Sequence, residues 1–298
     1  MALLTRKNKI KRSAGEWTFD ILNTLLMLLL AFITLYPFWY VLVCSFSNPV
    51  SVDAGIIYWW PDAFNVNSYL EVFAISNFWS AYRNTIFLAV GGTVVSMFFT
   101  ILTAYPLSKK RLWGRRGWTF IMIICMNFMA GMIPRYLIFR ATGVMNNHIM
   151  FLFAFALTPM NIILVRAYFE SVSDSLEESA KLDGAGDLTI LFKIYIPLSV
   201  PVIMTVSLYY FVARWNSYFW EMILFTDDNK VPLQVVLKNL VVEQNAKEDL
   251  ADEDGSMLKS KQTIIYATII CAALPMLVIY PFVQRFFVKG IMIGAVKG

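Results

Sequence analysis

Long apolar segments dominate this chain and limit what it can fold into. Six stretches are each long enough to cross a hydrocarbon layer about 30 Å thick as an α-helix that rises about 1.5 Å per residue. Only 15% of the residues are charged, against about 25% in soluble domains, so too little polar material is present to cover the apolar surface in water. We therefore expect an all-α integral membrane protein with six transmembrane helices. The six stretches are residues 19–45, 82–107, 117–139, 147–169, 199–225 and 262–284.

Proline and glycine residues interrupt several of these stretches. Proline frees a backbone carbonyl and kinks a helix, which membrane proteins tolerate where neighbouring helices pack closely. The third stretch is the most irregular, because Gly131 and Pro134 interrupt its apolar run. We therefore expect kinked helices. The prolines inside or near the ends of the stretches are Pro37, Pro106, Pro134, Pro159 and Pro275.

Basic residues between the stretches predict the orientation of the chain, because Lys and Arg are enriched in cytoplasmic loops. The basic arm of residues 1–18 and the loop after the second stretch are predicted to face the cytoplasm, whereas residues 45–81, which contain no Lys or Arg, face outward. Alternation then places residues 226–261 outside and the tail of residues 285–298 inside. The transmembrane domain of residues 19–284 thus includes the outer loops 45–81 and 226–261 and the inner loop 171–201. Both termini are thus expected in the cytoplasm. The basic residues of the loop after the second stretch are Lys109, Lys110, Arg111, Arg115 and Arg116.

Several kinds of chemistry find no support in the sequence. The formal net charge of +5 follows from the basic loops, so we expect contact with membrane lipid and none with nucleic acid. The three cysteines lie in apolar stretches without metal or disulfide spacing, and His148 is the only histidine, so no metal site is expected. The sequence contains no Gly-x-x-x-x-Gly-Lys phosphate loop, so the chain itself is expected to bind no nucleotide.

The loop between the fourth and fifth stretches, residues 171–201, is the most informative part of the chain. Ser175 and Glu178 have the spacing of a capping box that would start a short helix. Gly184 is a natural helix terminator, because glycine adopts a left-handed backbone without a steric penalty. Asp187 is placed to cap a second short helix, which Pro197 would end. We therefore expect two short helices at an angle on the cytoplasmic membrane surface, with a small residue at the corner.

This loop resembles the coupling motif of permease subunits in binding-protein-dependent ABC importers. That motif has Glu-Ala-Ala, three residues, Gly, nine residues, Ile, one residue and Leu-Pro. Two positions depart from it, Ser179 for Ala and Ile196 for Leu, and both changes are conservative. Asp183 and Ala185 flank Gly184 and complete the Asp-Gly-Ala form that sugar importers tend to show. The matching positions are Glu178, Ser179, Ala180, Gly184, Ile194 and Pro197.

The resemblance to this family extends over most of the chain. The stretch Trp-Asn-Ser-Tyr-Phe-Trp at residues 215–220 is similar to a Trp-Asn-aromatic stretch of sugar permeases, and residues 284–298 are similar to the C-terminus of the same family. The chain looks most like the smaller permease of the maltose type, within the branch that handles oligosaccharides and polygalacturonan-like sugars. The resemblance implies the type I ABC importer permease fold, with six transmembrane helices and a cytoplasmic two-helix coupling loop.

The resemblance also implies partners and roles. A second, related permease would form a heterodimer with this chain, and two ATPase subunits would bind ATP and Mg, so that this chain is not an enzyme and binds no cofactor. The importer would lie in a bacterial cell membrane. An extracellular solute-binding protein would deliver the oligosaccharide, and the outer residues 45–81 are a candidate docking surface for that protein. The residues expected to couple to the ATPase are Glu178, Ser179, Ala180, Asp183, Gly184, Ala185, Phe192 and Pro197. The tail residues expected at the ATPase interface are Gly294, Ala295, Val296 and Lys297.

The fifth stretch carries the candidates for contact with the substrate. Arg214, Trp215, Asn216 and Tyr218 lie there, and a charge inside a span is costly and a candidate for function. Arg214 would favour acidic sugars by paired hydrogen bonds to a carboxylate, or it would instead pair with Glu221 or with a carboxylate of the partner permease. The aromatic residues would stack on sugar rings or, as is more common, pack between helices.

Other classes of membrane protein compete with this interpretation. A secondary transporter would carry its own ion site, from paired intramembrane acids or from broken helices in a repeat, and the sequence shows neither. A membrane receptor or assembly factor would not need the coupling motif. Importers of metals, amino acids or phosphate share the motif, but the Asp-Gly-Ala form, the Trp-Asn stretch and the tail favour a sugar.

Overall fold

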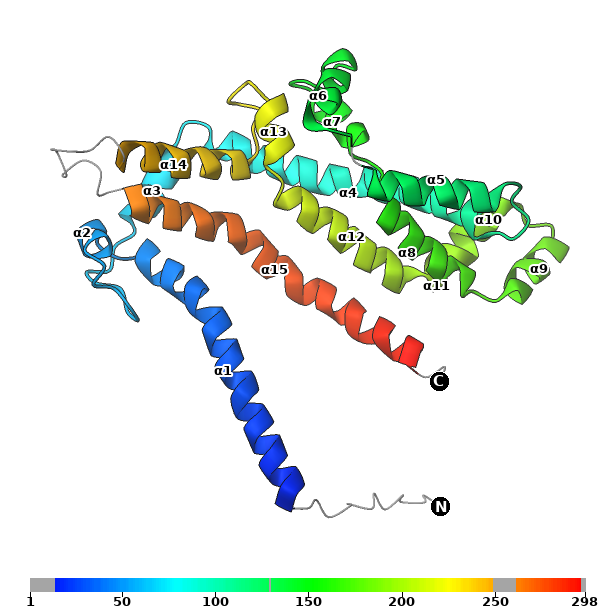
Figure 1. The fold of residues 1–298 in the computed structure, drawn as a ribbon, viewed down its shortest axis with the longest axis horizontal. Helices are drawn as coiled ribbons and strands as arrows, with labels where there is room; N and C mark the ends of the chain where they lie inside the picture. Colours follow the sequence, from blue (N-terminus) through cyan, green and yellow to red (C-terminus); the bar gives the residue numbers. More distant parts are fainter. Residues whose placement is uncertain (1–13, 129, 249–260, 296–298) are drawn as a thin grey trace. The chain divides into compact units, whose positions relative to one another are not determined.

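The computed structural model describes residues 14–128, 130–248 and 261–295, and every regular element in these ranges is a helix (Figure 1). The contacts within the chain define two units. One comprises Met1–Tyr69 with Asp254–Ile270, and the other comprises Leu70–Glu253 with Cys271–Gly298. The expected all-α architecture is therefore confirmed for the described part of the chain.

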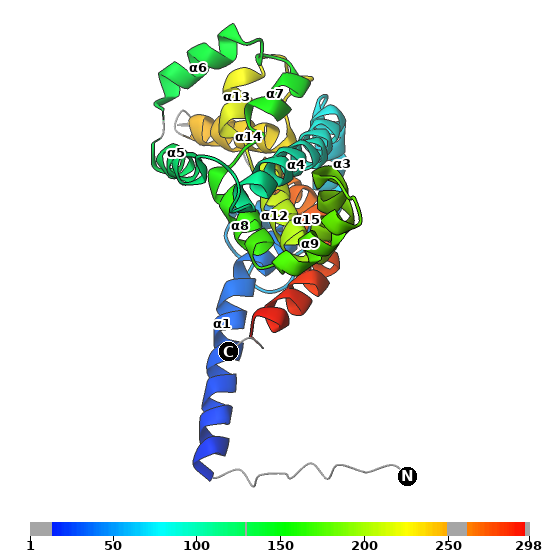
Figure 2. The ribbon, with the colours of Figure 1, turned by 90° about the vertical axis from the view of Figure 1, so that its right-hand side faces the viewer.

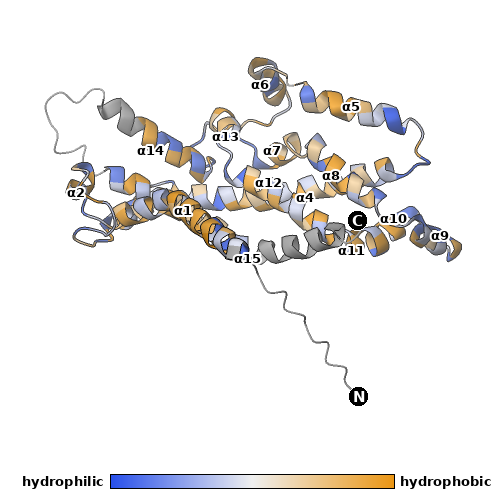
Figure 3. Cartoon of the chain, turned by 60° about the horizontal axis from the view of Figure 1, so that its bottom comes forward, coloured by the Kyte–Doolittle hydropathy of each residue, from blue (hydrophilic) through white to orange (hydrophobic). Residues whose placement is uncertain are grey.

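The first unit is built on α1, Ala14–Ser45, which continues through Pro37 without a break. The short helix α2, Pro49–Asp53, packs against the C-terminal end of α1. The small core there consists of Val43, Cys44, Val52 and Ile57. Most apolar side chains of α1 are exposed, and Figure 3 colours the helix orange along most of its length. So much exposed apolar surface requires lipid or another membrane protein around α1.

The second unit is organised around α4, Phe78–Ser108. Helices α8, Pro159–Glu170, and α12, Val200–Trp215, both pack against α4 (Figures 1 and 2). Their shared core reaches the end of α4 that bears the basic loop. The buried members of this core are Met97, Ala104, Tyr105, Leu107, Ile162, Val165, Phe169, Ile190, Leu191, Tyr195, Val206 and Tyr210.

Shorter helices complete the chain. Several of them lie in loops and breaks that the apolar pattern did not resolve. They are α3 (Asn67–Ala74), α5 (Arg115–Asn127), α6 (Met132–Ala141), α7 (His148–Ala154), α9 (Asp174–Leu182), α10 (Asp187–Ile190), the π-helix η1 (Leu191–Tyr195), α11 (Ile196–Leu198), α13 (Phe219–Leu224) and α14 (Leu233–Glu248). The last helix is α15 (Lys261–Ala295).

Within the described residues, three of the apolar stretches are single helices long enough to cross a membrane, namely those in α1, α4 and α15. The other three candidate spans are bent pairs: α5 with α6 at 111°, α7 with α8 at 60°, and Asp187–Leu198 with α12 at 83°. The described residues thus hold up to six spans, as expected, if each bent pair crosses as one. Two of the bends coincide with helix-breaking residues, because α6 begins directly after Gly131 and α8 begins at Pro159.

The fifth predicted stretch, residues 199–225, is wrong in its extent. Helix α12 ends at Trp215, and a separate short helix, α13, follows after residues 216–218. The predicted outer loop of residues 226–261 also contains a helix, α14, which packs against α4. The apolar run of residues 199–225 therefore indicates a membrane-spanning helix but does not show where that helix ends.

Candidate functional site

The segment that the sequence singles out forms a short helix, a corner and a second helix, and we call residues 174–198 the coupling segment. Its first helix, α9, starts after Ser173, whose hydroxyl lies 2.8 Å from that of Ser175. The predicted capping box of Ser175 and Glu178 is therefore wrong. The acidic residues of the first turn are Asp174 and Glu177, whose charges suit the positive end of a helix.

Gly184 forms the corner of the coupling segment. Its φ of +80° is left-handed, as expected for the residue that ends the helix. The amide of Gly184 donates to the Lys181 carbonyl at 3.0 Å, and the amide of Ala185 donates to the Ala180 carbonyl at 2.9 Å. These two hydrogen bonds make a Schellman cap, which satisfies the last carbonyls of α9 and turns the chain sharply.

The second helix differs from the sequence expectation at both ends. Gly186, not Asp187, is its N-cap, and the Asp187 carboxylate instead accepts a hydrogen bond from Arg111 at 2.5 Å. Pro197 does not end the helix, which runs on to Leu198. The π-helical turn of η1 ends at Tyr195, two residues before Pro197, and such a turn changes which carbonyls need an amide partner. The helix can therefore pass through a proline that has no N–H.

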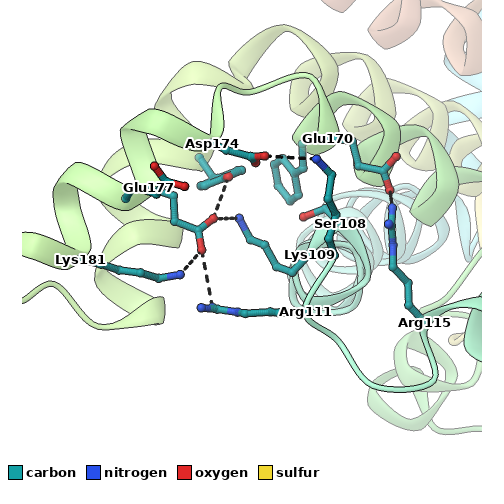
Figure 4. Close-up of a pocket in the computed structure, with 12 residues that line it drawn as sticks. Ser108, Lys109, Arg111, Arg115, Glu170, Asp174, Glu177 and Lys181 are labelled. Carbon is teal, nitrogen blue, oxygen red and sulfur yellow. Dashed lines mark hydrogen bonds and ion pairs between the residues drawn. The ribbon is translucent and has the colours of Figure 1, made fainter.

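Glu177 anchors the coupling segment to the end of α4. Its carboxylate accepts hydrogen bonds from Lys109 at 2.5 Å, from Tyr195 at 3.1 Å and from Lys181, and it lies 3.7 Å from the Arg111 guanidinium (Figure 4). We call these five residues the Glu177 cluster. Glu177 and Lys109 are both buried, although they are charged. A buried ion pair of this kind is costly to break, because either partner alone would leave an uncompensated charge.

The electrostatics of the Glu177 cluster favour a charged carboxylate. Burial alone would raise the pKa of Glu177, but the hydrogen bonds from Lys109 and Lys181 outweigh it and lower that pKa to about 2. The Lys109 ammonium also lies over the rings of Tyr105, at 4.4 Å, and Tyr195, at 3.6 Å. Glu177 is thus ionised throughout the physiological pH range.

The two sides of the coupling segment differ in character. Ala180 and Ala185 pack against the core that α4, α8 and α12 share. Away from that core the segment is open and apolar, since Leu182 is 90% exposed and Phe192 is 55% exposed. Leu188 is 65% exposed but lines a cavity with Lys109 and Trp113. Glu178 and Ser179 are exposed as well. One side therefore holds the segment to this chain, and the other is free to meet another protein.

The sequence did not single out the residues that anchor the segment. Lys109 and Arg111 served only as markers of orientation, and Tyr195 carried no role. The coupling motif matches Glu178 and not its neighbour Glu177. One signal was present, since Glu177 shares a helix face with Ala180 and Lys181, three and four residues on.

Arg214 lies between helices, where it supports the break between α7 and α8. Its guanidinium donates to the carbonyl of Phe155, the residue after α7, and lies over the ring of Phe155 at 5.4 Å. Gly92 makes room for it, because a Cβ there would lie 3.1 Å from the Arg214 Nε. Glu221 accepts instead from the hydroxyl of Ser217 at 2.8 Å. Arg214 and Glu221 therefore have different hydrogen-bond partners, and the alternative of an ion pair between them is not observed.

The other candidate residues differ in their exposure and contacts. Trp215 is 2% exposed and donates to the Ala272 carbonyl at 2.9 Å, so its indole packs between helices. Asn216 follows α12 as its C-cap, and Tyr218 precedes α13 and is 42% exposed. Of the tail residues, Gly294 and Ala295 fall in the last turn of α15, whereas Val296 and Lys297 lie outside the described residues.

Long apolar helices, bent helix pairs and the coupling segment together fit the membrane-embedded component of a transport system. The chain belongs to the family of binding-protein-dependent transport system inner membrane components, whose family model matches residues 1–293. This match confirms the family that the coupling motif indicated. It also makes the chain a multi-pass component of a bacterial membrane.

Individual relatives agree with the family. The chain is 36% identical to the permease protein YtcP of the polygalacturonan/rhamnogalacturonan transport system of Bacillus subtilis (strain 168), over 94% of this chain and 98% of the relative. It is 26% identical to the maltodextrin permease protein MdxG of the same organism, over 92% and 95% of the two chains. A crystal structure of a bacterial ABC transporter that imports the acidic polysaccharide alginate matches with 40% identity and a TM-score of 0.85, over 94% of this chain and all 100% of that chain. This last match confirms the ABC importer permease fold.

Proposed function

We propose that this chain is one permease of an ATP-driven importer for oligosaccharides that carry carboxylate groups. The observation that carries the proposal is the coupling segment, which is fixed to α4 by the Glu177 cluster and presents exposed apolar residues on its other side. A cytoplasmic ATPase that binds this open side would move α4 with it. The names of the relatives support a sugar substrate, and the alginate and polygalacturonan systems support an acidic one.

The remaining parts of the importer follow from the same proposal. A second permease forms the other half of the pathway and covers apolar surface that this chain leaves open. Two ATPase subunits bind ATP and Mg on the cytoplasmic side, where both termini of this chain lie. A solute-binding protein delivers the sugar to the outer side. A second solved structure, of a bacterial alginate ABC transporter in complex with an alginate pentasaccharide-bound periplasmic protein, gives a precedent for this step; it is 16% identical to this chain, with a TM-score of 0.64.

Uptake by proteoliposomes tests the proposal. The chain is reconstituted with its second permease, ATPase and solute-binding protein, and uptake of a galacturonate trimer is compared with uptake of a neutral trimer of the maltose series. We expect uptake to require ATP inside and the binding protein outside, with the acidic sugar taken up at least tenfold faster. Uptake driven by an ion gradient without ATP would point to a secondary transporter, and equal uptake of both sugars would refute the acidic substrate.

A further inference from the structure

A basic cavity lies between α5 and α8, away from the open side of the coupling segment. It has a volume of about 430 Å³. Three guanidinium groups meet there, from the first turn of α5 and from α8. Such a meeting of cations needs a compensating anion or water. The residues that line the cavity are Arg115, Arg116, Thr119, Phe120, Ile123 and Arg166.

The positive charge of this cavity is only partly compensated by the chain itself. Arg115 and Arg166 both pair with one carboxylate, that of Glu170, to which the Arg166 Nε donates at 2.7 Å. Arg116 is exposed, and no hydrogen bond or ion pair joins it to the described residues. Three cations against one anion leave an excess of two positive charges. The cavity therefore has the charge to attract an anion.

The donors of the cavity suit a phosphate group. A guanidinium has five N–H donors, and its fork matches the oxygens of phosphate. The Arg166 NH1 group donates to Thr119 at 2.5 Å, and the Arg115 Nε donates to the Leu107 carbonyl at 2.9 Å. These contacts hold two of the three guanidinium groups in place and leave further donors unused. The Arg116 side chain is free to complete the set.

An apolar surface begins directly beside the cations. Phe120 is 63% exposed and Ile123 is 45% exposed, and both also line the cavity. Figure 3 shows α5 blue at its first turn and mostly orange beyond it. Trp118, on the same helix, is exposed, as is usual for tryptophan at a membrane interface. A ligand that fits must therefore join an anionic group to a hydrocarbon chain.

We propose that this cavity binds an anionic phospholipid, with the phosphate at Arg116 and Arg166 and an acyl chain along Phe120 and Ile123. Basic pockets between transmembrane helices bind lipid headgroups of this kind on the cytoplasmic side. The proposal agrees with the basic loop facing the cytoplasm, and it does not depend on which solute is imported.

Lipid retention measured by native mass spectrometry tests this site. The full-length chain, purified with its partner subunits, is released from nanodiscs made of equal parts of phosphatidylcholine and phosphatidylglycerol. We expect wild-type protein to retain phosphatidylglycerol preferentially, and Arg116→Gln to lower that retention about fivefold. This factor corresponds to about 1 kcal/mol per basic residue near the membrane surface, converted at about 1.4 kcal/mol per tenfold. Arg116→Lys is expected to keep most of the retention, because it keeps the charge.

Lys110→Gln is the matched control. It removes the same charge from the same basic stretch, residues 109–116, but Lys110 pairs with Asp174 at 3.3 Å and does not line the cavity. Equal loss in both variants would show that only the general surface charge matters, and unchanged retention in Arg116→Gln would show that the cavity holds no lipid or is covered by the second permease. Displacement of phosphatidylglycerol by excess inorganic phosphate would show a free-anion site. Each of these three results would overturn the proposal.

Discussion

Glu177→Gln is expected to release the coupling segment from α4 and to abolish coupled transport. The substitution keeps the shape of the side chain but leaves the buried Lys109 ammonium without its counter-charge. Removing one partner of a buried pair typically costs about 3–5 kcal/mol. We expect amide hydrogen exchange over residues 174–182 to accelerate at least about 100-fold, since each 1.4 kcal/mol is a factor of about ten. Sugar uptake should fall by at least tenfold in the same protein.

Asp174→Asn is the control for this prediction. Asp174 lies one turn earlier on α9 and also pairs with a lysine, Lys110, but both side chains are largely exposed. An exposed pair contributes only about 0–1 kcal/mol, so exchange and uptake should stay close to wild type. The double variant Glu177→Gln with Lys109→Met should recover part of the lost protection, because no buried charge is then left alone. Equal effects of Glu177→Gln and Asp174→Asn would contradict the anchoring role of Glu177.

Leu182→Glu is expected to detach the ATPase while leaving this chain folded. Leu182 is 90% exposed, so a carboxylate there meets water in the isolated chain. In the importer, the same position would lie against the ATPase, where a buried leucine contributes about 2–3 kcal/mol and a buried carboxylate costs more. We expect at least a 30-fold loss of affinity for the ATPase, measured by the fraction retained on size-exclusion chromatography, and an unchanged melting temperature of the detached chain.

Trp113→Glu provides a control of equal exposure. Trp113 is also 90% exposed and lies in the loop between α4 and α5, outside the coupling segment. The same charge introduced there should leave the ATPase bound. Loss of the ATPase in Trp113→Glu but not in Leu182→Glu would show that the docking surface lies elsewhere on this chain.

The six predicted spans are a number that the described residues allow, because three single helices and three bent pairs are apolar enough to cross a membrane, but the shape of the spans was predicted poorly. The length of an apolar run must match the thickness of the membrane, so such runs indicate how many spans the described residues can form. Their breaks do not follow from proline alone: α1 and α4 run through Pro37 and Pro106, whereas the helix of the fourth stretch is interrupted just before Pro159. Whether a proline kinks or interrupts a helix depends on which distant groups satisfy the freed carbonyls.

The candidate site was predictable where its geometry is local. Gly184 forms the expected corner, because a left-handed residue after a short helix depends on a few neighbouring residues. The anchoring of the segment was not predictable, since Lys109 and Glu177 are 68 residues apart in the sequence. The same holds for Arg214, whose partner is the carbonyl of Phe155, 59 residues away. Pairings over such distances depend on how the helices pack, and the local patterns do not encode them.

We propose, as the resemblance to ABC importer permeases implies, that the Gly184 corner enters a close-fitting groove of the ATPase and that the motion of the ATPase thereby reaches α4. The most direct test compares Gly184→Ala with Gly184→Trp in proteoliposomes, with binding-protein-stimulated ATP hydrolysis and sugar uptake measured together. Both variants bear a similar cost of about 1–2 kcal/mol for a left-handed residue, and a Cβ at Gly184 meets nothing within 4 Å in this chain. Their difference therefore reports on the space outside the chain. We predict that the alanine variant keeps most of both activities and that the tryptophan variant loses both by at least tenfold. Equal activities in the two variants would contradict the claim.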